Sequence, residues 1–187
     1  MLFHLFAHDN HSWMVGSTDR IHPESGCPVC PKCGYRIDRD FTARNFSLRQ
    51  KRYDISCCYD GAVIVSTRFK ELCASMGADR LAFTSLEANP GFFHLKCTDP
   101  VALDYDAMGT ARTRFCPECG IFRDFTGYGR IVLLGDPTIS ATELVFSDGR
   151  FGSNNESIPL LIAGGEFASA FKAAQFKGIA SCEPINA

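Results

Sequence analysis

Long apolar segments and an excess of charge of one sign are both missing from this 187-residue sequence. Its longest apolar runs, Ile131 to Leu134 and Ile158 to Ala163, have the length of strands and are far too short to span a membrane. The start, Met1 to Asp9, is interrupted by polar residues and has no basic segment before its apolar part, unlike a secretory signal. We therefore expect a soluble protein of the cytoplasm that has no membrane partner.

The balance of charges argues against nucleic acid as the main partner. The chain has 19 basic and 21 acidic residues, a formal net charge of −2, whereas neutralising phosphates needs a clear excess of Lys and Arg. The most basic stretch, residues 36–52, is interrupted by Asp38 and Asp40. This stretch could contact an acidic partner or RNA, or it could be an ordinary charged face in solvent.

Recognisable catalytic motifs are missing as well. The sequence has no phosphate loop, no nucleotide-binding glycine fingerprint, no nucleophile elbow and no His-Glu-x-x-His helix. Asp104 and Asp106 could act as paired carboxylates, but a solvated loop is the simpler interpretation. The five histidines show no metal-binding spacing. We expect a protein that is not an enzyme.

Cysteine, in contrast, is plentiful, and four of the ten cysteines form two copies of one motif. The motifs Cys30-Pro-Lys-Cys33-Gly and Cys116-Pro-Glu-Cys119-Gly share their spacing, their proline and their glycine. A gap of two residues lets both sulfurs turn towards one ion, and glycine permits a backbone conformation closed to other residues. Proline stiffens the turn, and backbone N–H groups within it can hydrogen-bond the sulfurs.

We predict that Cys30, Cys33, Cys116 and Cys119 bind one structural zinc ion. Zinc favours four tetrahedral ligands, and four cysteines leave no open position for a substrate water. The 82 residues between Cys33 and Cys116 far exceed the gap in a compact zinc ribbon, so the metal would tie distant parts of one domain together. Metal binding contributes on the order of 10 kcal/mol in zinc peptides, so the metal-free protein should be loosened or unfolded.

Other uses of these cysteines stay open at the level of sequence. Free thiols in exposed turns, or disulfides, would give the same pattern, although a reducing compartment favours metal ligation. Cys27 precedes Cys30 by a gap of two residues and could replace Cys30 or Cys33; Gly34, which matches Gly120, favours the predicted pair. For the remaining cysteines burial is the default: Cys57, Cys58, Cys73, Cys97 and Cys182.

Hydrophobic periodicity predicts two helices among short strands. Apolar residues at i, i+3, i+4 and i+7 indicate one helix over 67–76, ended by Gly77, and another over 166–177, ended by Gly178. Turns are expected at Asp60-Gly61, Asn89-Pro90-Gly91 and Asp148-Gly149. Strands are expected over 53–59, 62–65, 81–83, 92–95, 112–115, 121–125, 130–134, 142–147, 158–163 and 179–182.

The two halves of the chain follow one plan, in which a Cys-Pro-x-Cys-Gly motif precedes a strand, a helix and a strand. A shift of 98 residues superimposes Phe69 on Phe167. The pattern fits a duplication with halves 27–105 and 112–187, and it fits coincidence equally well, because all amphipathic helices share a period. We expect a single α+β domain over 1–187, with two strand–helix–strand units and β-hairpins joined by a zinc-knuckle site of four cysteines.

The two motifs and the end of the chain resemble the double-CxxCG protein family, which is common in myxobacteria. The similar stretch includes Phe146-Ser-Asp-Gly-Arg-Phe-Gly, the strand Pro159-Leu-Leu-Ile-Ala, the helix over 166–177, Lys177-Gly178 and Glu183-Pro184-Ile185. The middle of the chain is similar only loosely, and Cys27 is a departure from the family pattern. The resemblance implies an immunity protein of a bacterial polymorphic toxin system, encoded beside a toxin and acting by tight binding to it.

We therefore predict a non-enzymatic protein whose partner is a cognate toxin protein. The alternative is a zinc-ribbon-type nucleic-acid-binding or regulatory module that uses residues 36–52, and its binding would fall steeply with salt. A third hypothesis is an enzyme with an unfamiliar site, which a deep pocket lined by titratable residues would favour.

Overall fold

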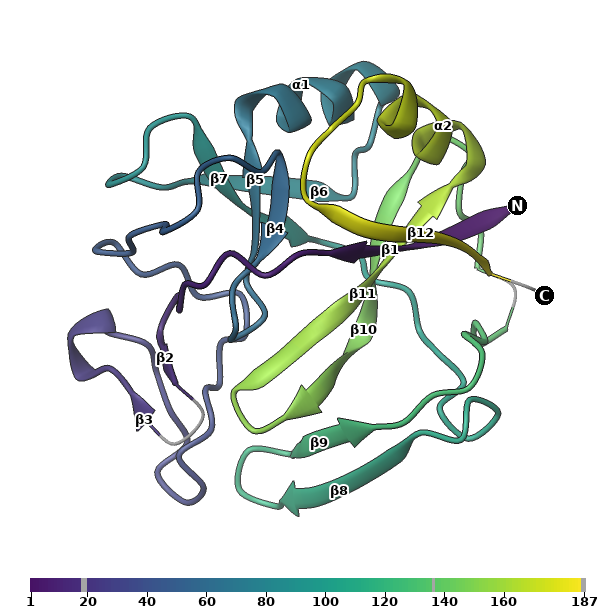
Figure 1. Cartoon of the computed structure of the whole chain (residues 1–187). Helices are drawn as coiled ribbons and strands as arrows, with labels where there is room; N and C mark the ends of the chain where they lie inside the picture. The colour runs from purple at the N-terminus through teal and green to yellow at the C-terminus, as the bar shows by residue number, and fades with distance from the viewer. Residues whose placement is uncertain (18–19, 136, 186–187) are drawn as a thin grey trace.

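The computed structural model describes residues 1–17, 20–135 and 137–185, and these residues form a mixed fold in which antiparallel sheet predominates (Figure 1). The larger sheet contains the strands β1 (Leu2–Ala7), β8 (Ala111–Cys116), β9 (Ile121–Thr126), β10 (Leu144–Ser153), β11 (Glu156–Gly164) and β12 (Ile179–Ile185). Its spatial order is β12-β1-β11-β10-β9-β8. The expected mixture of strands and helices is confirmed, with more sheet than expected.

The second sheet has four strands: β4 (Ile55–Cys57), β5 (Val63–Ser66), β6 (Leu81–Ser85) and β7 (Phe92–Cys97). Its order is β4-β5-β7-β6, and every neighbouring pair is antiparallel. A short ribbon of β2 (Gly16–Ser17) and β3 (Arg20–Ile21) is followed by η1, a turn of 3₁₀ helix (Pro23–Ser25). Within the described residues, neither α-helix has the length and apolar character that crossing a membrane would take.

The helix predicted over 67–76 is confirmed as α1 (Thr67–Met76). Ser66 begins it, because its side chain accepts a hydrogen bond from the backbone N–H of Phe69. Gly77 ends it in a left-handed conformation, with φ 68°. The helix α2 (Gly165–Ala173) follows β11 directly.

The two helices lie side by side and close the main core over both sheets (Figure 1). Phe69 of α1 is fully buried, and its ring centroid lies 6.2 Å from that of Phe167 and 6.1 Å from that of Phe171, both on α2. Phe69 and Phe167 are the residues that the shift of 98 superimposes. These edge-to-face contacts join the two sheets into one core.

The strands around the two helices follow matching paths. β5 and β6 run parallel with β7 between them, and β11 and β12 run parallel with β1 between them. Around α1 the middle strand, β7, follows the helix in the chain, whereas around α2 the middle strand is β1, which precedes the helix by more than 150 residues. The two units and the halves 27–105 and 112–187 stay a prediction, and β1 belongs to neither half.

Two predicted elements are absent from the structure. Residues 130–134 form no strand, and only an isolated bridge joins Leu133 to Leu103. Asp148 and Gly149 lie inside β10 instead of forming a turn. The register with β11 shifts between Phe146 and Arg150, and a side chain at Gly149 would collide with Tyr105.

The second helix is shorter than predicted. It ends at Ala173 instead of residue 177, and Gln175 takes a left-handed conformation with φ 53°. The chain turns there because Phe176 stacks on Phe171, with ring centroids 5.2 Å apart, and because the backbone N–H of Lys177 donates to Asp54 at 2.9 Å. Tertiary contacts thus override a helical periodicity.

A long irregular segment, residues 26–54, leads from η1 to β4 and carries the first cysteine motif. A second buried cluster holds it, in which Ala43, Phe46 and Leu48 pack against residues of β5 and its neighbours. Asn89 supports it by donating to the carbonyl of Phe46 at 2.8 Å and accepting from the N–H of Leu48 at 3.2 Å. The segment is therefore ordered by packing in place of regular hydrogen bonding.

Candidate metal centre

The first motif forms a tight turn within this irregular segment. The N–H of Cys30 donates to the carbonyl of Tyr35 at 2.8 Å, and the N–H of Gly34 donates to the carbonyl of Cys30 at 2.8 Å. Gly34 has φ 69°, the left-handed conformation that the motif predicts for glycine. An isolated bridge between Val29 and Arg36 closes the loop on both sides.

The second motif is the turn between β8 and β9, where a hairpin knuckle is expected. The N–H of Gly120 donates to the carbonyl of Cys116 at 2.8 Å, and Gly120 has φ 70°. The two turns therefore have the same hydrogen bond and the same glycine conformation, although one lies in a hairpin and the other in a loop.

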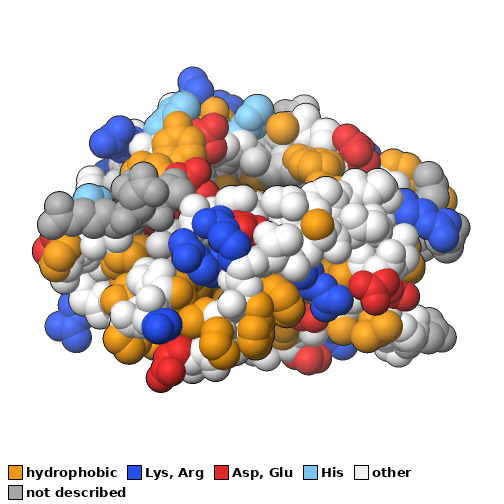
Figure 2. Space-filling view, turned by 90° about the horizontal axis from the view of Figure 1, so that it is seen from below, with side chains coloured by type: hydrophobic (Ala, Val, Ile, Leu, Met, Phe, Trp, Pro, Cys, Tyr) orange, Lys and Arg blue, Asp and Glu red, His pale blue; other side chains and the backbone are white. Residues whose placement is uncertain are grey.

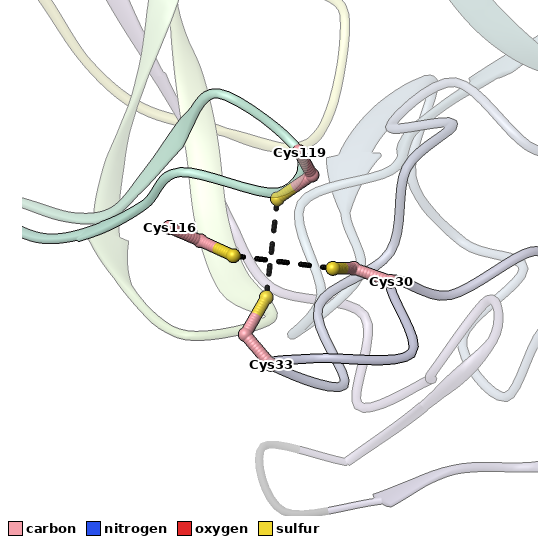
Figure 3. A group of neighbouring side chains, drawn as sticks. All are labelled: Cys30, Cys33, Cys116 and Cys119. Atoms are coloured by element: carbon pink, nitrogen blue, oxygen red, sulfur yellow. Dashed lines mark hydrogen bonds between the residues drawn. The ribbon is translucent and has the colours of Figure 1, made fainter.

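The four predicted cysteines point their sulfurs at a common centre (Figure 3). All four Sγ atoms lie within 4.8 Å of one another, and the Cys30–Cys116 and Cys33–Cys119 separations are both 3.9 Å. Sulfurs placed 2.3 Å from a central zinc ion stand about 3.8 Å apart at the corners of a tetrahedron. A disulfide needs a separation of about 2 Å, so these thiols are free. The cluster is compatible with one metal ion.

Backbone N–H groups of the turns are directed at the sulfurs. Those of Cys119 and Glu118 donate to Cys116 and lower the pKa of its thiol to about 7. Burial raises the pKa of Cys33 and of Cys119, and the N–H groups of Tyr35 and Ile121, which donate to these two sulfurs, oppose that rise. Such donors orient and stabilise thiolate ligands in metal sites.

The residues after the first motif anchor it to the sheets. Tyr35 is buried, and its hydroxyl lies 3.3 Å from Oγ of Ser157 on β11. Arg36 is 0% exposed, and its guanidinium donates to the carbonyl of Asp60. Half-buried Arg39 donates to the carbonyl of Phe122 on β9 at 3.3 Å and thereby links the two motif-bearing segments.

These contacts correct the interpretation of residues 36–52 as one charged face. Arg36 belongs to the interior and Arg39 is half-buried, whereas the later cations remain exposed: Arg44, Arg49, Lys51 and Arg52. Sequence reasoning missed the role of Arg36 because an arginine near other arginines and acids normally lies at the surface. Two of its nitrogens, Nε and one Nη, are buried without a hydrogen-bond partner among the described residues.

The other candidate residues lie outside the cluster. Cys27 Sγ lies 3.8 Å from the carbonyl oxygen of Pro28 and is not among the four grouped sulfurs. Asp104 accepts a hydrogen bond from the N–H of Ala107, and exposed Asp106 pairs with Arg112, with 3.3 Å between Oδ1 and Nη2. Of the five other cysteines, Cys57, Cys58 and Cys73 are buried as expected, and Cys97 and Cys182 are half-buried.

Comparison of the chain with protein-family models and with curated proteins finds no match.

Proposed function

We propose that Cys30, Cys33, Cys116 and Cys119 hold one Zn²⁺ ion, which clips the irregular segment 26–54 to the β8–β9 hairpin. The separations of 3.9 Å and the N–H groups aimed at the sulfurs support this proposal. Four thiolates leave no coordination position for substrate, so the ion is structural. It joins two segments that contribute no residue to the core around the helices.

Elemental analysis of purified protein tests the metal directly. We expect about one zinc per chain and a loss of at least half of it in Cys30→Ser and in Cys119→Ser. Cys27→Ser is the matched control and should keep its zinc. Iron in place of zinc, a zinc content near zero in the unaltered protein, or zinc loss in Cys27→Ser equal to that in Cys30→Ser would contradict the proposed site.

We further propose that the protein acts in the cytoplasm, without catalysis, by binding and neutralising a cognate bacterial toxin. The observation that carries this proposal is the placement of exposed apolar side chains on the two metal-binding segments. Val29 and Ile37 flank the first turn and are 40% and 51% exposed, and Phe115 precedes Cys116 and is 53% exposed. Exposed apolar groups on a rigid frame are typical of the central contacts of protein interfaces.

The side of the molecule on which β8 and β9 lie has the mixed character of such an interface. Figure 2 shows hydrophobic side chains there, interspersed with Lys, Arg, Asp and Glu. Interfaces commonly place apolar anchors inside a polar rim. The resemblance of the cysteine motifs and of the C-terminal stretch to the double-CxxCG proteins supports a toxin as the partner.

The test uses the toxin domain encoded next to the gene of this protein. We expect tight binding by calorimetry, and we expect co-expression of the protein to protect cells from the toxin. Ile37→Asp and Phe115→Asp should each weaken binding at least tenfold, a loss of about 1.4 kcal/mol. Leu134→Asp, a control at a residue 56% exposed outside these segments, should leave it unchanged. Failure to bind or protect would refute the toxin partner.

The nucleic-acid alternative depends on the exposed cations Arg44, Arg49, Lys51 and Arg52. Titration with a single-stranded RNA oligonucleotide at two salt concentrations distinguishes it from the protein partner. Binding to nucleic acid would lose affinity steeply as salt rises, because each neutralised phosphate releases counterions. The proposed protein interface combines apolar anchors with a mixed polar rim, so its affinity should depend less steeply on salt.

A further inference from the structure

Two adjoining cavities open where β1 and β12 meet the irregular segment 127–134. The first has a volume of about 180 Å³ and a polar wall that includes His4, Tyr128 and Glu183. The second has a volume of about 360 Å³ and a mainly apolar wall. Arg130, Ile131 and Ile185 line both cavities. Together they reach the size that small-molecule sites commonly have.

The polar cavity is built around a buried histidine. His4 is 5% exposed, lines the cavity and has no hydrogen-bond partner among the described residues. Burial lowers the pKa of His4 to about 4, although Glu183 opposes the shift, so the imidazole is neutral at pH 7. A neutral imidazole carries one hydrogen-bond donor and one acceptor, and neither ring nitrogen of His4 is closed off from the cavity. A polar ligand would satisfy them.

Groups of both charges line the cavity together with His4. Glu183 is the cross-strand partner of His4 in the β1–β12 register, and the ring centroid of Tyr128 lies 6.4 Å from that of His4. Arg130 lines the same cavity, yet within the described part of the chain it forms no ion pair with Glu183 or any other carboxylate. A cation and an anion that face one cavity without touching match a ligand that carries both charges.

The apolar cavity adjoins the polar one, with Arg130 in the wall of both. Its wall consists of Met1, Leu2, Val132, Leu133 and the shared Ile131 and Ile185. An aliphatic or aromatic side chain placed there would be removed from water, at a gain of about 25 cal/mol for each Å² of apolar surface buried.

We propose that the paired cavities bind a free α-amino acid with an apolar side chain. Its carboxylate lies at Arg130, its ammonium group at Glu183, and its side chain in the apolar cavity, while His4 and Tyr128 hydrogen-bond the head group. This site lies apart from the cysteine cluster and is independent of the proposed toxin partner.

The test is a calorimetric titration of the metal-loaded protein with L-leucine and three analogues that each lack one recognised group. The analogues are 4-methylpentanoate without the ammonium group, 3-methylbutylamine without the carboxylate, and glycine without the side chain. We expect one leucine per chain and binding at least tenfold weaker for every analogue. L-Isoleucine and L-phenylalanine extend the series of apolar side chains.

Variants identify the protein groups. Arg130→Gln and Glu183→Gln, both at exposed positions that can be changed without disturbing the core, should each weaken leucine binding at least tenfold. Arg44→Gln and Glu87→Gln are matched controls at exposed positions outside both cavities and should bind as the unaltered protein does. His4→Asn should also weaken binding, with circular dichroism to confirm its fold.

Three outcomes overturn the proposal. One is the lack of saturable binding for all three amino acids up to about 10 mM, roughly tenfold above a Kd of 1 mM. Another is unchanged leucine binding in both Arg130→Gln and Glu183→Gln. The last is binding of 4-methylpentanoate as tight as that of leucine, which would make the site one for simple carboxylates. Toxin binding is measured separately, so each proposal can fail without the other.

Discussion

The glycines that follow each cysteine pair show what single residues contribute to the metal centre. Gly34 and Gly120 have nearly equal left-handed φ angles, and a Cβ added at either would meet no atom within 4 Å. Any loss on substitution would therefore come from backbone strain alone and not from a collision.

Gly120→Ala should lower the free energy of unfolding by about 1 kcal/mol in the zinc-loaded protein, because alanine resists the left-handed conformation. Urea unfolding measures the change. Gly129→Ala is the matched control, since Gly129 has no left-handed φ and equally open surroundings. A loss in Gly129→Ala as large as that in Gly120→Ala would contradict the assignment to strain.

His94 is a second residue with a measurable effect, because it is buried and its Nδ1 lies 2.8 Å from Oγ1 of Thr42. Burial, together with the charges of Lys96, Arg150 and Arg36, lowers the pKa of His94 well below 6.5. The unfolded imidazole takes up a proton below pH 6.5, whereas the folded one stays neutral. Stability therefore falls as the pH drops below 6.5, by up to about 1.4 kcal/mol per pH unit.

His94→Gln should remove this part of the pH dependence. We expect the difference in unfolding free energy between the unaltered protein and His94→Gln to shrink or change sign between pH 7.5 and pH 5.5. Zinc is kept in excess for both proteins, so that protonation of the cysteines contributes equally to each. A difference independent of pH would show that His94 titrates normally.

At the scale of elements, the contact between α1 and α2 is where packing matters most. Phe69 contacts the rings of Phe167, Phe171 and Phe176 and is fully buried. We expect Phe69→Ala to cost about 3–5 kcal/mol in thermal or urea unfolding. Phe115→Ala, at a residue 53% exposed, should cost less than about 0.5 kcal/mol. Equal losses would mean that the helices do not form the main core.

Local patterns predicted the elements that depend on their own residues. The helix α1 has its N-cap, Ser66, and its stop, Gly77, directly at its two ends. The hairpins at Asp60-Gly61 and Asn89-Pro90-Gly91 follow from the turn-forming residues themselves. The early end of α2 and the bulge at Gly149 arise from contacts with Phe171, Asp54 and Tyr105, which no local pattern reveals. The position of β1 between β11 and β12 likewise has no local signal.

The features of the candidate site also divide into those that local sequence predicts and those that depend on the fold. The spacing of the four cysteines was sufficient to group them, because each turn fixes two sulfurs locally and only the meeting of the turns depends on the fold. The interior positions of Arg36 and Arg39, and the cavity around His4, depend on segments distant in the sequence. Composition and periodicity carry no information about contacts between such distant segments.

At the scale of the whole molecule, the metal should hold together segments that the core does not. Removal of zinc by a chelator should increase hydrogen exchange first in residues 27–42 and 111–126, while α1, α2 and β11 stay protected longer. Hydrogen exchange followed by mass spectrometry measures this order. Cys30→Ser should reproduce the pattern without chelator, and uniform loss of protection would show that the metal supports the entire fold.

The position of β1 between β11 and β12 has a consequence for folding during synthesis. Residues 2–7 are synthesised well before residues 161–164 and 179–185, which are their hydrogen-bonding neighbours in the sheet. The sulfur pairs of the metal centre are likewise separated by 86 positions. The larger sheet therefore cannot close until β11 and β12 have been synthesised, and β1 stays without its partners in the sheet until then.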